Sequence, residues 1–326
     1  MTQRPNNIIS KAKPEMQTRL KTLMPDVKDW KSFCDISDLH PVNSLRVNTL
    51  KISVDELKTR LEKKWKIKQP YKSNPEIFVV ESDLSPGELG KAIEHILGYY
   101  YIQEIASMMP IIALKPKENE IVIDICAAPG SKTTQAAMHM GNAGTLIAND
   151  ASPGRLGILS TNIQRCGVTN SIVTKSPGEL LCKNLSNLKI KVDKILVDAP
   201  CSGEGTIRSS VQSVKMFSKN LINKLSRTQE RLVKAAIEVL KENGEMVYST
   251  CTHAPEENEA IVSYILENHP EMKIESINIP LKTRNGITEW QGVKFHKDVV
   301  KAARIYPQDN NTEGFFIAKF RKIKNE

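Results

Sequence analysis

One short stretch, residues 121–134, constrains the fold more than any other part of this chain. It begins with an apolar run, Ile121 to Ile125, that is typical of a buried parallel strand. The next segment, Ala127 to Gly130, is too small and too sharply bent to extend a strand, and Gly130 lets a ligand approach the backbone closely. Ser131 is placed to cap the helix that follows. This order predicts an open α/β sheet with a ligand at the carboxyl end of the strand.

The loop in this stretch matches neither the dinucleotide pattern G-x-G-x-x-G nor the phosphate-binding pattern G-x-x-x-x-G-K-[ST]. Two interpretations therefore stay open, a site for a nucleoside-type cofactor and an ordinary tight turn. A second predicted strand ends at Asp150, where a carboxylate in nucleotide-binding α/β folds can hold ribose hydroxyls. Its position favours the cofactor interpretation.

Strand and helix patterns alternate along most of the chain. We predict further strands at residues 44–50, 77–80, 145–150, 171–174, 194–197, 245–248 and 314–320, and helices at 54–61, 152–166 and 226–241 and from Pro255 onward. The fold class is therefore α/β. Residues 106–326 are expected to form a Rossmann-like sheet flanked by helices, and residues 1–105 a helical segment with a small α+β domain. Pro5-Asn6-Asn7 argues against order at the very start.

The composition is that of a soluble globular protein with a basic balance. Lys and Arg number 46 against 37 Asp and Glu, a formal charge of +9, which favours a polyanionic partner such as nucleic acid or reflects only a basic proteome. We predict no membrane span and no secretory leader. None of the six cysteines stands in C-x-x-C, so we predict no metal site and a reducing, cytoplasmic location.

Two clusters in the first third of the chain have two interpretations each. Lys63, Lys64, Lys66 and Lys68 could grip phosphates or form a solvated face. The tyrosines at 99–101 could stack on bases, or form an aromatic cluster in the core where the domains meet. We favour the core for the tyrosines.

Chemically reactive side chains follow three predicted strands. They are the loop 126–132, the turn from Asp198 to Ser202, and the turn Thr250-Cys251, which can converge because parallel strands bring their carboxyl ends to one edge. A thiolate that adds to C6 of cytosine lets C5 attack an electrophilic methyl group, an acid near N3 assists the addition, and a second group must then remove the C5 proton. Asp198, Cys201 and Cys251 supply these types of group. The alternative, cysteines acting as small buried hydrophobes, is commoner for a single cysteine.

On these motifs the chain resembles the Sun/Fmu and nucleolar-protein family of S-adenosylmethionine-dependent RNA cytosine-5 methyltransferases. The matching segments are residues 124–133, 148–150 with Arg155, 198–205, 249–251 with 255–258, 98–110, 314–318 and Arg46-Val-Asn48 in the leading domain. They cover roughly residues 40 to 320 and stand in the family's order. The resemblance implies a methyltransferase sheet and a leading domain with an RNA-recognition-like fold.

The same resemblance implies roles for individual residues. Cys251 would be the nucleophile, Cys201 would assist product release, Asp198 would contact the cytosine edge, and Lys132 would lie between cofactor and base. Residues expected to bind S-adenosylmethionine are Cys126, Ala127, Ala128, Pro129, Gly130, Ser131, Lys132, Asp150, Arg155, Ser176 and Asp198. In DNA cytosine methyltransferases the cysteine of the Pro-Cys turn is the nucleophile instead. The role given to Cys201 here therefore depends on the resemblance to this family and not on a physical argument. The partner would be RNA, with tRNA favoured over rRNA, and the protein a monomer.

Two positions depart from the family pattern. Ser176 stands where the family usually carries an Asp near the adenine, and the loop after Gly205 lacks a proline that the family often has. The alternatives are a small-molecule or protein methyltransferase, which needs no pair of Cys turns, a nicotinamide oxidoreductase, which needs the missing glycine pattern, and a non-catalytic RNA-binding assembly factor, which needs no reactive residues.

Overall fold

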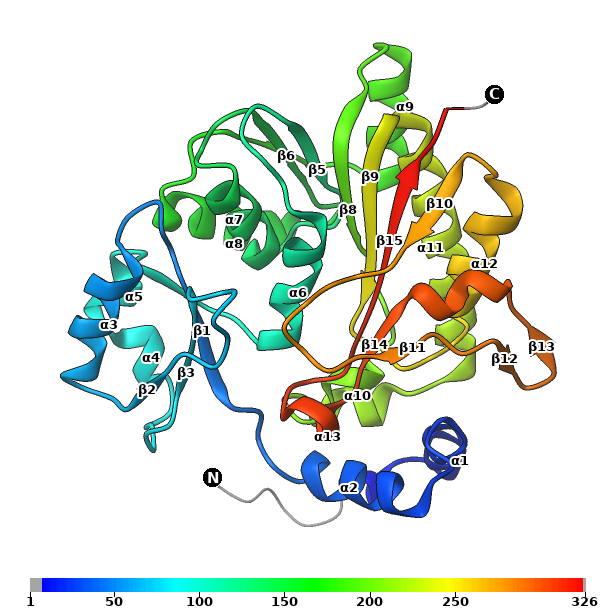
Figure 1. The fold of residues 1–326 in the computed structure, drawn as a ribbon, viewed down its shortest axis with the longest axis horizontal. Coiled ribbons are helices and arrows are strands. Elements are labelled where there is room, and N and C mark those ends of the chain that lie inside the picture. The colour runs from blue at the N-terminus through cyan, green and yellow to red at the C-terminus, as the bar shows by residue number, and fades with distance from the viewer. Residues whose placement is uncertain (1–7, 325–326) are drawn as a thin grey trace.

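The computed structural model describes residues 8–324 and holds two large sheets that lie side by side, the smaller near the N-terminus (Figure 1). The expectation about Pro5-Asn6-Asn7 lies outside the described residues. The smaller sheet has the order β2-β3-β1-β4 and is antiparallel throughout. The elements up to its last strand are η1 (Ile9–Lys11), α1 (Pro14–Leu23), α2 (Val27–Ser37), β1 (Asn43–Val47), α3 (Val54–Glu62), β2 (Ile67–Lys68), β3 (Ile77–Val80), α4 (Glu88–Lys91), α5 (Ile93–Ile96) and β4 (Tyr100–Ile102).

The larger sheet has nine strands in the order β11-β14-β15-β9-β8-β5-β6-β7, with β10 paired to β15. Its central strands are parallel, and β15 joins them antiparallel to β9. The strands are β5 (Ile121–Asp124), β6 (Thr145–Asn149), β7 (Ser171–Thr174), β8 (Val192–Asp198), β9 (Leu240–Thr250), β10 (Met272–Glu275), β11 (Arg284–Asn285), β14 (Ala303–Ile305) and β15 (Phe315–Lys322). This is the Rossmann-like α/β architecture that the sequence predicts.

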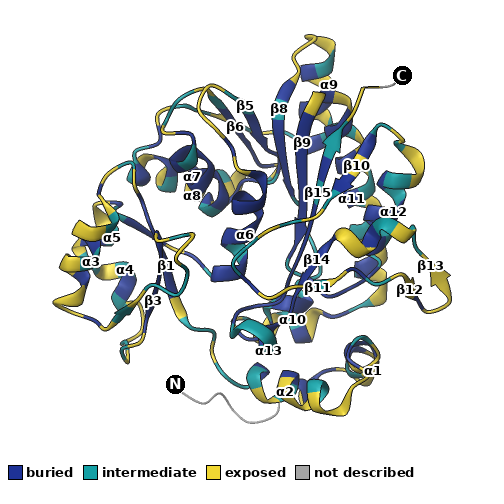
Figure 2. Cartoon of the chain, viewed as in Figure 1, coloured by how far each residue is buried: buried dark blue, intermediate teal, exposed yellow. Residues whose placement is uncertain are grey.

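Helices cover both faces of the larger sheet (Figure 2). Successive residues of a strand point to opposite faces, so Val122 packs with the helices of one face and Ile123 with those of the other. The first face carries α6 (Ile105–Leu114), α7 (Ser131–His139) and α8 (Pro153–Cys166), and the second carries α9 (Gly178–Asn187), α11 (Lys219–Val239) and α12 (Glu259–Asn268). The remaining elements are η2 (Glu204–Thr206), α10 (Val211–Met216), η3 (Lys297–Lys301), α13 (Pro307–Asn310) and the hairpin β12 (Glu289–Trp290) and β13 (Val293–Lys294).

Buried polar contacts join the small sheet to the large one. Arg46 of β1 is fully buried and donates to Gln103 Oε1 at 3.0 Å and to Thr134 Oγ1 in the first turn of α7 at 2.9 Å. Asn48 donates from its amide to the carbonyls of Gly98 and Cys166, each at 2.8 Å. The Arg46-Val-Asn48 segment therefore ties the N-terminal sheet to the helices beside the predicted cofactor loop.

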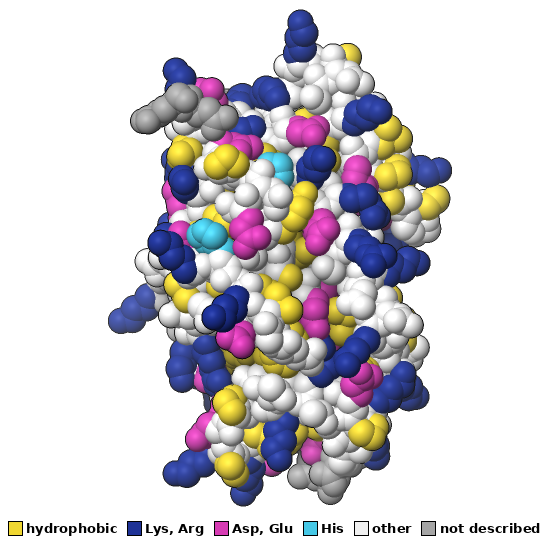
Figure 3. Space-filling model, turned by 90° about the vertical axis from the view of Figure 1, so that its right-hand side faces the viewer, with side chains coloured by type: hydrophobic (Ala, Val, Ile, Leu, Met, Phe, Trp, Pro, Cys, Tyr) yellow, Lys and Arg dark blue, Asp and Glu magenta, His cyan; other side chains and the backbone are white. Residues whose placement is uncertain are grey.

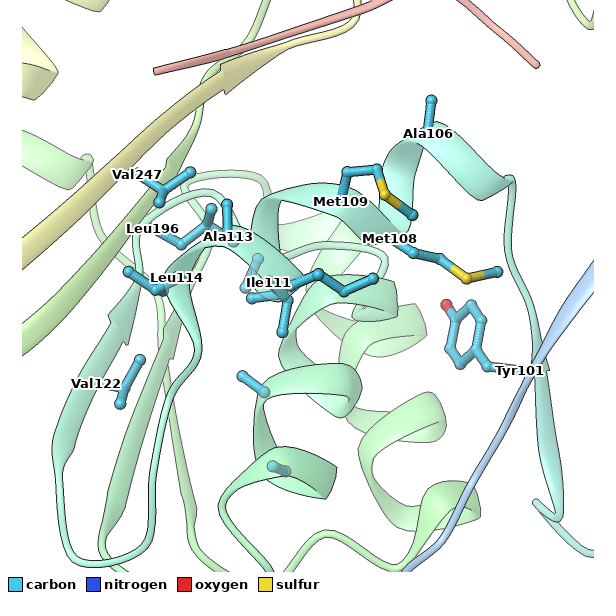
Figure 4. Close-up of a cluster of buried hydrophobic side chains, with 14 of the residues drawn as sticks. Tyr101, Ala106, Met108, Met109, Ile111, Ala113, Leu114, Val122, Leu196 and Val247 are labelled. Atoms are coloured by element: carbon cyan, nitrogen blue, oxygen red, sulfur yellow. The ribbon is translucent and has the colours of Figure 1, made fainter. Parts of the chain in front are cut away.

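Two of the three tyrosines at 99–101 are buried in the core, and Tyr99 is half-buried at its edge. Tyr100 is fully buried and donates its hydroxyl to the Leu89 carbonyl at 2.6 Å. Tyr101 packs with α6, β5 and β8 in one apolar cluster (Figure 4), and the guanidinium groups of Arg46 and Arg165 lie against its ring. Tyr101 is thus part of the packing where the two sheets meet, whereas Tyr100 lies in the core of the small N-terminal domain.

The N-terminal helices pack beneath the larger sheet rather than beside the smaller one (Figure 1). Met16, Leu20 and Phe33 share an apolar cluster with Ile207, Phe217 and Ala254, which flank the two cysteine turns. Arg19 donates twice to the carboxylate of Glu256, at 2.9 and 2.7 Å. The helical segment therefore braces the loops that carry the reactive cysteines.

Three local predictions are wrong. Gly130, with φ of 104°, is the N-cap of α7, so Ser131 is the first helical residue and caps nothing. Pro255 opens no helix, because residues 255–258 form turns and α12 begins at Glu259. The helix predicted at 226–241 runs from Lys219 to Val239, and β9 already starts at Leu240. There Asn243 takes a positive φ within the strand, next to a register shift against β8.

The lysines near β2 lie beside acidic side chains. Lys66 and Lys68 lie within 4 Å of the Glu81 carboxylate, and Lys64 pairs with Glu94 at 2.8 Å. On the face shown in Figure 3, lysine and arginine side chains alternate with acidic ones. The pairing favours the solvated-face interpretation of the lysine cluster. Within residues 8–324 no helix combines the length and apolarity that a bilayer crossing requires.

Candidate active site

A cavity of about 880 Å³ opens between the two sheets, at the carboxyl ends of β5 and β8. One wall comprises Asp124 and most of the loop 126–132, and we call it the cofactor side. Another wall comprises Glu104, Ser107, Thr206, Glu313 and Phe315, and we call it the nucleotide side. Cys251, Lys132 and Asp198 line the cavity between them. The three strand ends that the sequence singled out therefore meet at one place.

The two predicted catalytic cysteines touch each other. Their Sγ atoms lie 3.1 Å apart, and the backbone N–H of Cys251 donates to the sulfur of Cys201 at 3.3 Å. Only Cys251 lines the cavity. The hydrogen bond with Cys251, and after it burial, raise the pKa of the Cys201 thiol well above its usual range. The two thiols are therefore unlike, one facing the cavity and the other held behind it.

Side chains of residues 255–258 form hydrogen bonds to both cysteine turns. Glu257 accepts the backbone N–H of Ser202, next to Cys201, at 3.0 Å, and the amide of Gln229 at 2.9 Å. Asn258 accepts the hydroxyl of Thr250 at 2.6 Å and donates to the Thr252 carbonyl at 2.9 Å, on either side of Cys251. A regular helix from Pro255 could not aim these side chains at both turns.

Two backbone hydrogen bonds through Gly205, which we call the backbone latch, fix the main chain of Cys251. The N–H of Gly205 donates to the Cys251 carbonyl, and the N–H of Gly314 donates to the Gly205 carbonyl, each at 2.9 Å. A Cβ atom on Gly205 would lie 2.4 Å from the Gly314 oxygen and 2.8 Å from the Cys251 oxygen. Only glycine fits between these two segments, because real Cβ atoms do not approach backbone oxygens so closely.

Lys132 and Asp198 form an ion pair in the cavity wall. Lys132 Nζ lies 2.8 Å from Asp198 Oδ2 and donates to Ser107 Oγ at 3.0 Å, while Ser249 donates to Asp198 Oδ1 at 2.7 Å. Burial alone would lower the pKa of Lys132, but the carboxylate of Asp198 outweighs it and raises that pKa. The lysine is therefore charged at neutral pH.

On the cofactor side the cavity is lined by backbone, small side chains and one buried carboxyl group. Cys126, Ala127, Ala128, Pro129, Ser131 and Lys132 line the cavity, whereas Gly130 only caps α7 behind it. Asp124 accepts the Thr133 hydroxyl at 2.7 Å through Oδ2, but its buried Oδ1 has no partner. Burial raises the pKa of Asp124 to about 7. An orphaned acceptor on this wall fits a cofactor that carries a hydrogen-bond donor.

The remaining predicted cofactor residues lie outside the cavity wall. Asp150 accepts the N–H of Ala128 at 3.2 Å and of Ser152 at 2.9 Å. Arg155 donates to the Ala128 carbonyl and lies 3.5 Å from the Asp150 carboxylate. Ser176 holds the Asn149 amide through its backbone carbonyl at 2.9 Å. Asp150 and Arg155 thus support the loop at Ala128, and the structure gives the Ser176 side chain no place in the cavity.

Asp124, Glu104, Ser107, Thr206, Glu313 and Phe315 also line the cavity, although none of them was predicted as a site residue. The usable signals were the position of Asp124 at the end of a strand and the family-like segments 98–110, 124–133 and 314–318, which contain four of these residues. No group of three or more His, Cys, Asp or Glu side chains in residues 8–324 is arranged to hold a metal ion.

Comparison with known proteins gives two family matches. Residues 111–321 match the 16S rRNA methyltransferase RsmB/F family, and residues 14–105 match the N-terminal domain of 16S rRNA methyltransferase RsmF. The chain is 41% identical over 280 residues to the tRNA (cytosine(49)-C(5))-methyltransferase of Pyrococcus abyssi, covering 86% of this chain and 88% of that protein. It is 35% identical over 314 residues to ribosomal RNA small subunit methyltransferase F of Erwinia tasmaniensis, covering 95% of this chain and 63% of that longer protein.

Two solved structures resemble the whole chain. A methyltransferase homolog protein from Pyrococcus horikoshii is 34% identical, with a TM-score of 0.77 over 95% of this chain and 100% of that one. NSun6 from the same organism, solved with SFG, an analogue of S-adenosylmethionine, is 27% identical, with a TM-score of 0.81 over 96% of this chain and 99% of that one.

The sheet, the loop and the paired cysteine turns define a methyltransferase of the Rossmann-like class. The chain belongs to the RsmB/F family of RNA cytosine-C5 methyltransferases, whose cofactor is S-adenosylmethionine. The predicted family, fold class and cofactor are thereby confirmed.

Proposed function

We propose that this protein methylates C5 of a cytosine in tRNA through a covalent bond between Cys251 and C6. The observation that carries the proposal is the contact of the two thiols, 3.1 Å apart, beside the Lys132–Asp198 ion pair and the cofactor side of one cavity. We also propose that it acts as a monomer, since all of these groups come from one chain, and that it works in the cytoplasm, where free thiols persist. The division into residues 1–105 and 106–326 is likewise our proposal.

The geometry supports Cys251 rather than Cys201 as the nucleophile. Cys251 lines the cavity and can reach a base held there, whereas Cys201 stands behind it. A thiol with a raised pKa stays protonated and is a poor nucleophile at neutral pH. In this scheme Cys251 loses its proton to solvent and attacks as a thiolate. Its sulfur bonds to C6, and the electron pair of the C5–C6 double bond moves to C5.

Lys132 and Asp198 would assist the addition at the edge of the base. Asp198 accepts from the exocyclic amine of cytosine, and the charged Lys132 stabilises negative charge that develops on the ring. Bound S-adenosylmethionine supplies the electrophilic methyl group. Asp124 and residues 126–132 would hold it, with Asp150 and Arg155 keeping the loop in shape.

Cys201 would serve the last step. The hydrogen bond with Cys251 is the largest cause that raises its pKa. Once the sulfur of Cys251 is bonded to C6, Cys251 no longer forms this hydrogen bond as a free thiol. Cys201, which is partly exposed, would then lose its own proton to solvent and take the C5 proton as a thiolate. The C6–S bond then breaks, its electrons restore the C5–C6 double bond, and Cys251 leaves as a thiolate.

The choice of tRNA is supported by the archaeal tRNA enzyme, which this chain matches at 41% over 88% of its length. Ribosomal RNA is the second candidate, favoured by both family descriptions. The test is incubation with labelled S-adenosylmethionine and, separately, unmodified tRNA and small-subunit rRNA, followed by mapping of 5-methylcytosine. Label in tRNA alone is the expected result, label in rRNA alone would replace the substrate, and no label in either would overturn the activity.

A further inference from the structure

The two thiols of the active site are close enough to bond to each other. Their Sγ atoms lie 3.1 Å apart, and a disulfide bond is about 2.05 Å long, so closure requires an approach of about 1 Å. The sulfur of Cys201 already accepts the backbone N–H of Cys251 at 3.3 Å, which places it against the main chain of the other turn. We expect rotation of the two side chains to supply the remaining approach.

Hydrogen bonds on both turns keep the two sulfurs at this spacing. Glu257 accepts the backbone N–H of Ser202, the residue after the first cysteine. Asn258 accepts the hydroxyl of Thr250, the residue before the second cysteine. The backbone latch holds the carbonyl of Cys251. Because both groups are held in place, a reaction between them is intramolecular and strongly favoured over reaction with a thiol free in solution.

Cys251 is the cysteine most open to an oxidant. It is partly exposed and lines the cavity. As the proposed nucleophile it reacts as a thiolate, and the thiolate is also the form that oxidants attack. Burial raises the pKa of the thiols of Cys34, Cys126, Cys166 and Cys182, which keeps these four protonated and much less reactive.

We propose that Cys201 and Cys251 form a redox switch, in which a hydroperoxide joins them as a disulfide and methylation stops until a dithiol reduces the bond. The effect on methylation rests on the proposed function, because it requires Cys251 to be the nucleophile. The disulfide itself rests on the contact of the two sulfurs. Disulfides of cytosolic proteins are usually transient and either catalytic or redox-sensing, and this pair would be of the second kind.

The oxidation balances in two steps. The thiolate of Cys251 attacks one oxygen of hydrogen peroxide, the O–O bond breaks, and hydroxide leaves, so the sulfur becomes a sulfenic acid. Cys201 then loses its proton to hydroxide, its sulfur attacks the sulfenic sulfur, and the S–O bond breaks. The two thiols have lost two electrons and two protons, and one peroxide has become two water molecules. A dithiol reverses the change by thiol–disulfide exchange and becomes a disulfide itself.

The second cysteine would also protect the first from permanent damage. A sulfenic acid that no thiol traps is oxidised further to a sulfinic acid, which dithiols do not reduce. Because the sulfur of Cys201 is in contact with that of Cys251, it traps the sulfenic acid before this happens. The active site therefore stops working reversibly.

The test exposes the full-length protein to hydrogen peroxide, removes the excess with catalase and blocks the remaining thiols with N-ethylmaleimide. Cleavage after lysine and arginine places the two cysteines in separate peptides, residues 195–208 and 242–273, each with a single cysteine. Mass spectrometry should find these peptides joined, with the loss of two hydrogen atoms. RNA methylation should fall in proportion to the joined fraction and return after dithiothreitol. The affinity for S-adenosylmethionine should stay the same, because the bond forms outside the cofactor side.

Two variants separate the pair from general oxidation. In Cys201→Ser the partner thiol is gone, so the peptide that carries Cys251 should gain two oxygen atoms, and dithiothreitol should not remove them. Cys34→Ser is the matched control, because Cys34 is also partly exposed but belongs to α2 and does not line the cavity. It should form the disulfide, lose methylation and regain it as the unaltered protein does.

Several results would overturn the switch. One is a loss of methylation without joined peptides, or a loss that dithiothreitol does not reverse. Another is oxidation of Cys34 while Cys201 and Cys251 stay unjoined, and a third is a complete disulfide that leaves methylation intact. If the reduced protein methylates no RNA, the proposed function fails and the effect on methylation with it, while the joined peptides still decide whether the two thiols pair.

Discussion

The two sides of the cavity are built in different ways. The cofactor side comes from one continuous stretch, Asp124 and residues 126–132, held by Asp150 and Arg155 at Ala128. The nucleotide side is assembled from three separate segments, around Glu104, Thr206 and Glu313, and Cys251 lies between the two sides. The first depends on local backbone shape and the second on contacts between distant parts of the chain. Substitutions on the nucleotide side should therefore lower turnover, whereas substitutions on the cofactor side should lower the affinity for S-adenosylmethionine.

The largest effect is expected from the paired cysteines between the two sides. Cys251→Ala cannot form the bond to C6 and should lose roughly a thousandfold or more of turnover. Cys201→Ala should still attack and transfer the methyl group, and then stall with RNA attached. A denaturing gel with labelled RNA should show a slow band for Cys201→Ala and none for Cys251→Ala. A trapped band only in Cys251→Ala would mean that the two roles are exchanged.

The backbone latch gives the next largest effect. In Gly205→Ala the new Cβ meets two backbone oxygens and must displace Cys251, so kcat should fall about 100-fold, as expected for a misplacement near 1 Å. Gly157→Ala is the matched control, because nothing lies within 4 Å of its Cβ and α8 accepts alanine readily. Equal activity of the two variants would show that the latch does not position the nucleophile. The affinity for S-adenosylmethionine should stay constant in both.

Glu204, next to the latch, should make stability depend on pH. Burial raises its pKa from 4.5 to about 7, so between these values the folded chain keeps a proton that the unfolded chain has lost. The unfolded state then binds fewer protons, and the free energy of unfolding falls as pH rises through this window. Glu204→Gln should remove this penalty, on the order of 3 kcal/mol at pH 8, and change little at pH 4. Denaturant unfolding at both pH values measures it, and an equal gain at both would contradict the pKa assignment.

The smallest effect is expected on the cofactor side. Asp150→Ala removes the acceptor of the Ala128 and Ser152 N–H groups, so the loop loosens and the affinity for S-adenosylmethionine should fall about tenfold. The kcat at saturating cofactor should change much less. Calorimetric titration measures the affinity, and Asp150→Asn, which keeps one acceptor, is the control. An unchanged affinity would remove Asp150 from the cofactor site.

The same contrast explains how much the sequence could predict. The loop 126–132 and the turns at Cys201 and Cys251 were predictable, because strand periodicity and turn residues mark them locally, and the sheet then brings strand ends together. Glu313 and Glu104 carry no local pattern, and only the pairing of β15 with β9 and the burial around them make them significant. The turns at 255–258 failed as a helix prediction because Glu257 and Asn258 bind the two cysteine turns instead.

Arg46, buried between the sheets, bears on what the RNA must do. Because it donates to Gln103 on one side and to Thr134 of α7 on the other, it holds the small sheet against the helices of the larger one, and we expect the cavity not to open wide enough for a paired helix. The deformation needed to bring a cytosine ring down to Cys251 therefore falls on the nucleic acid. Unstacking and unpairing a base requires a few kcal/mol, and least where the base is already loosely held. We therefore expect the enzyme to prefer cytosines that unpair and unstack easily over cytosines in stable helices.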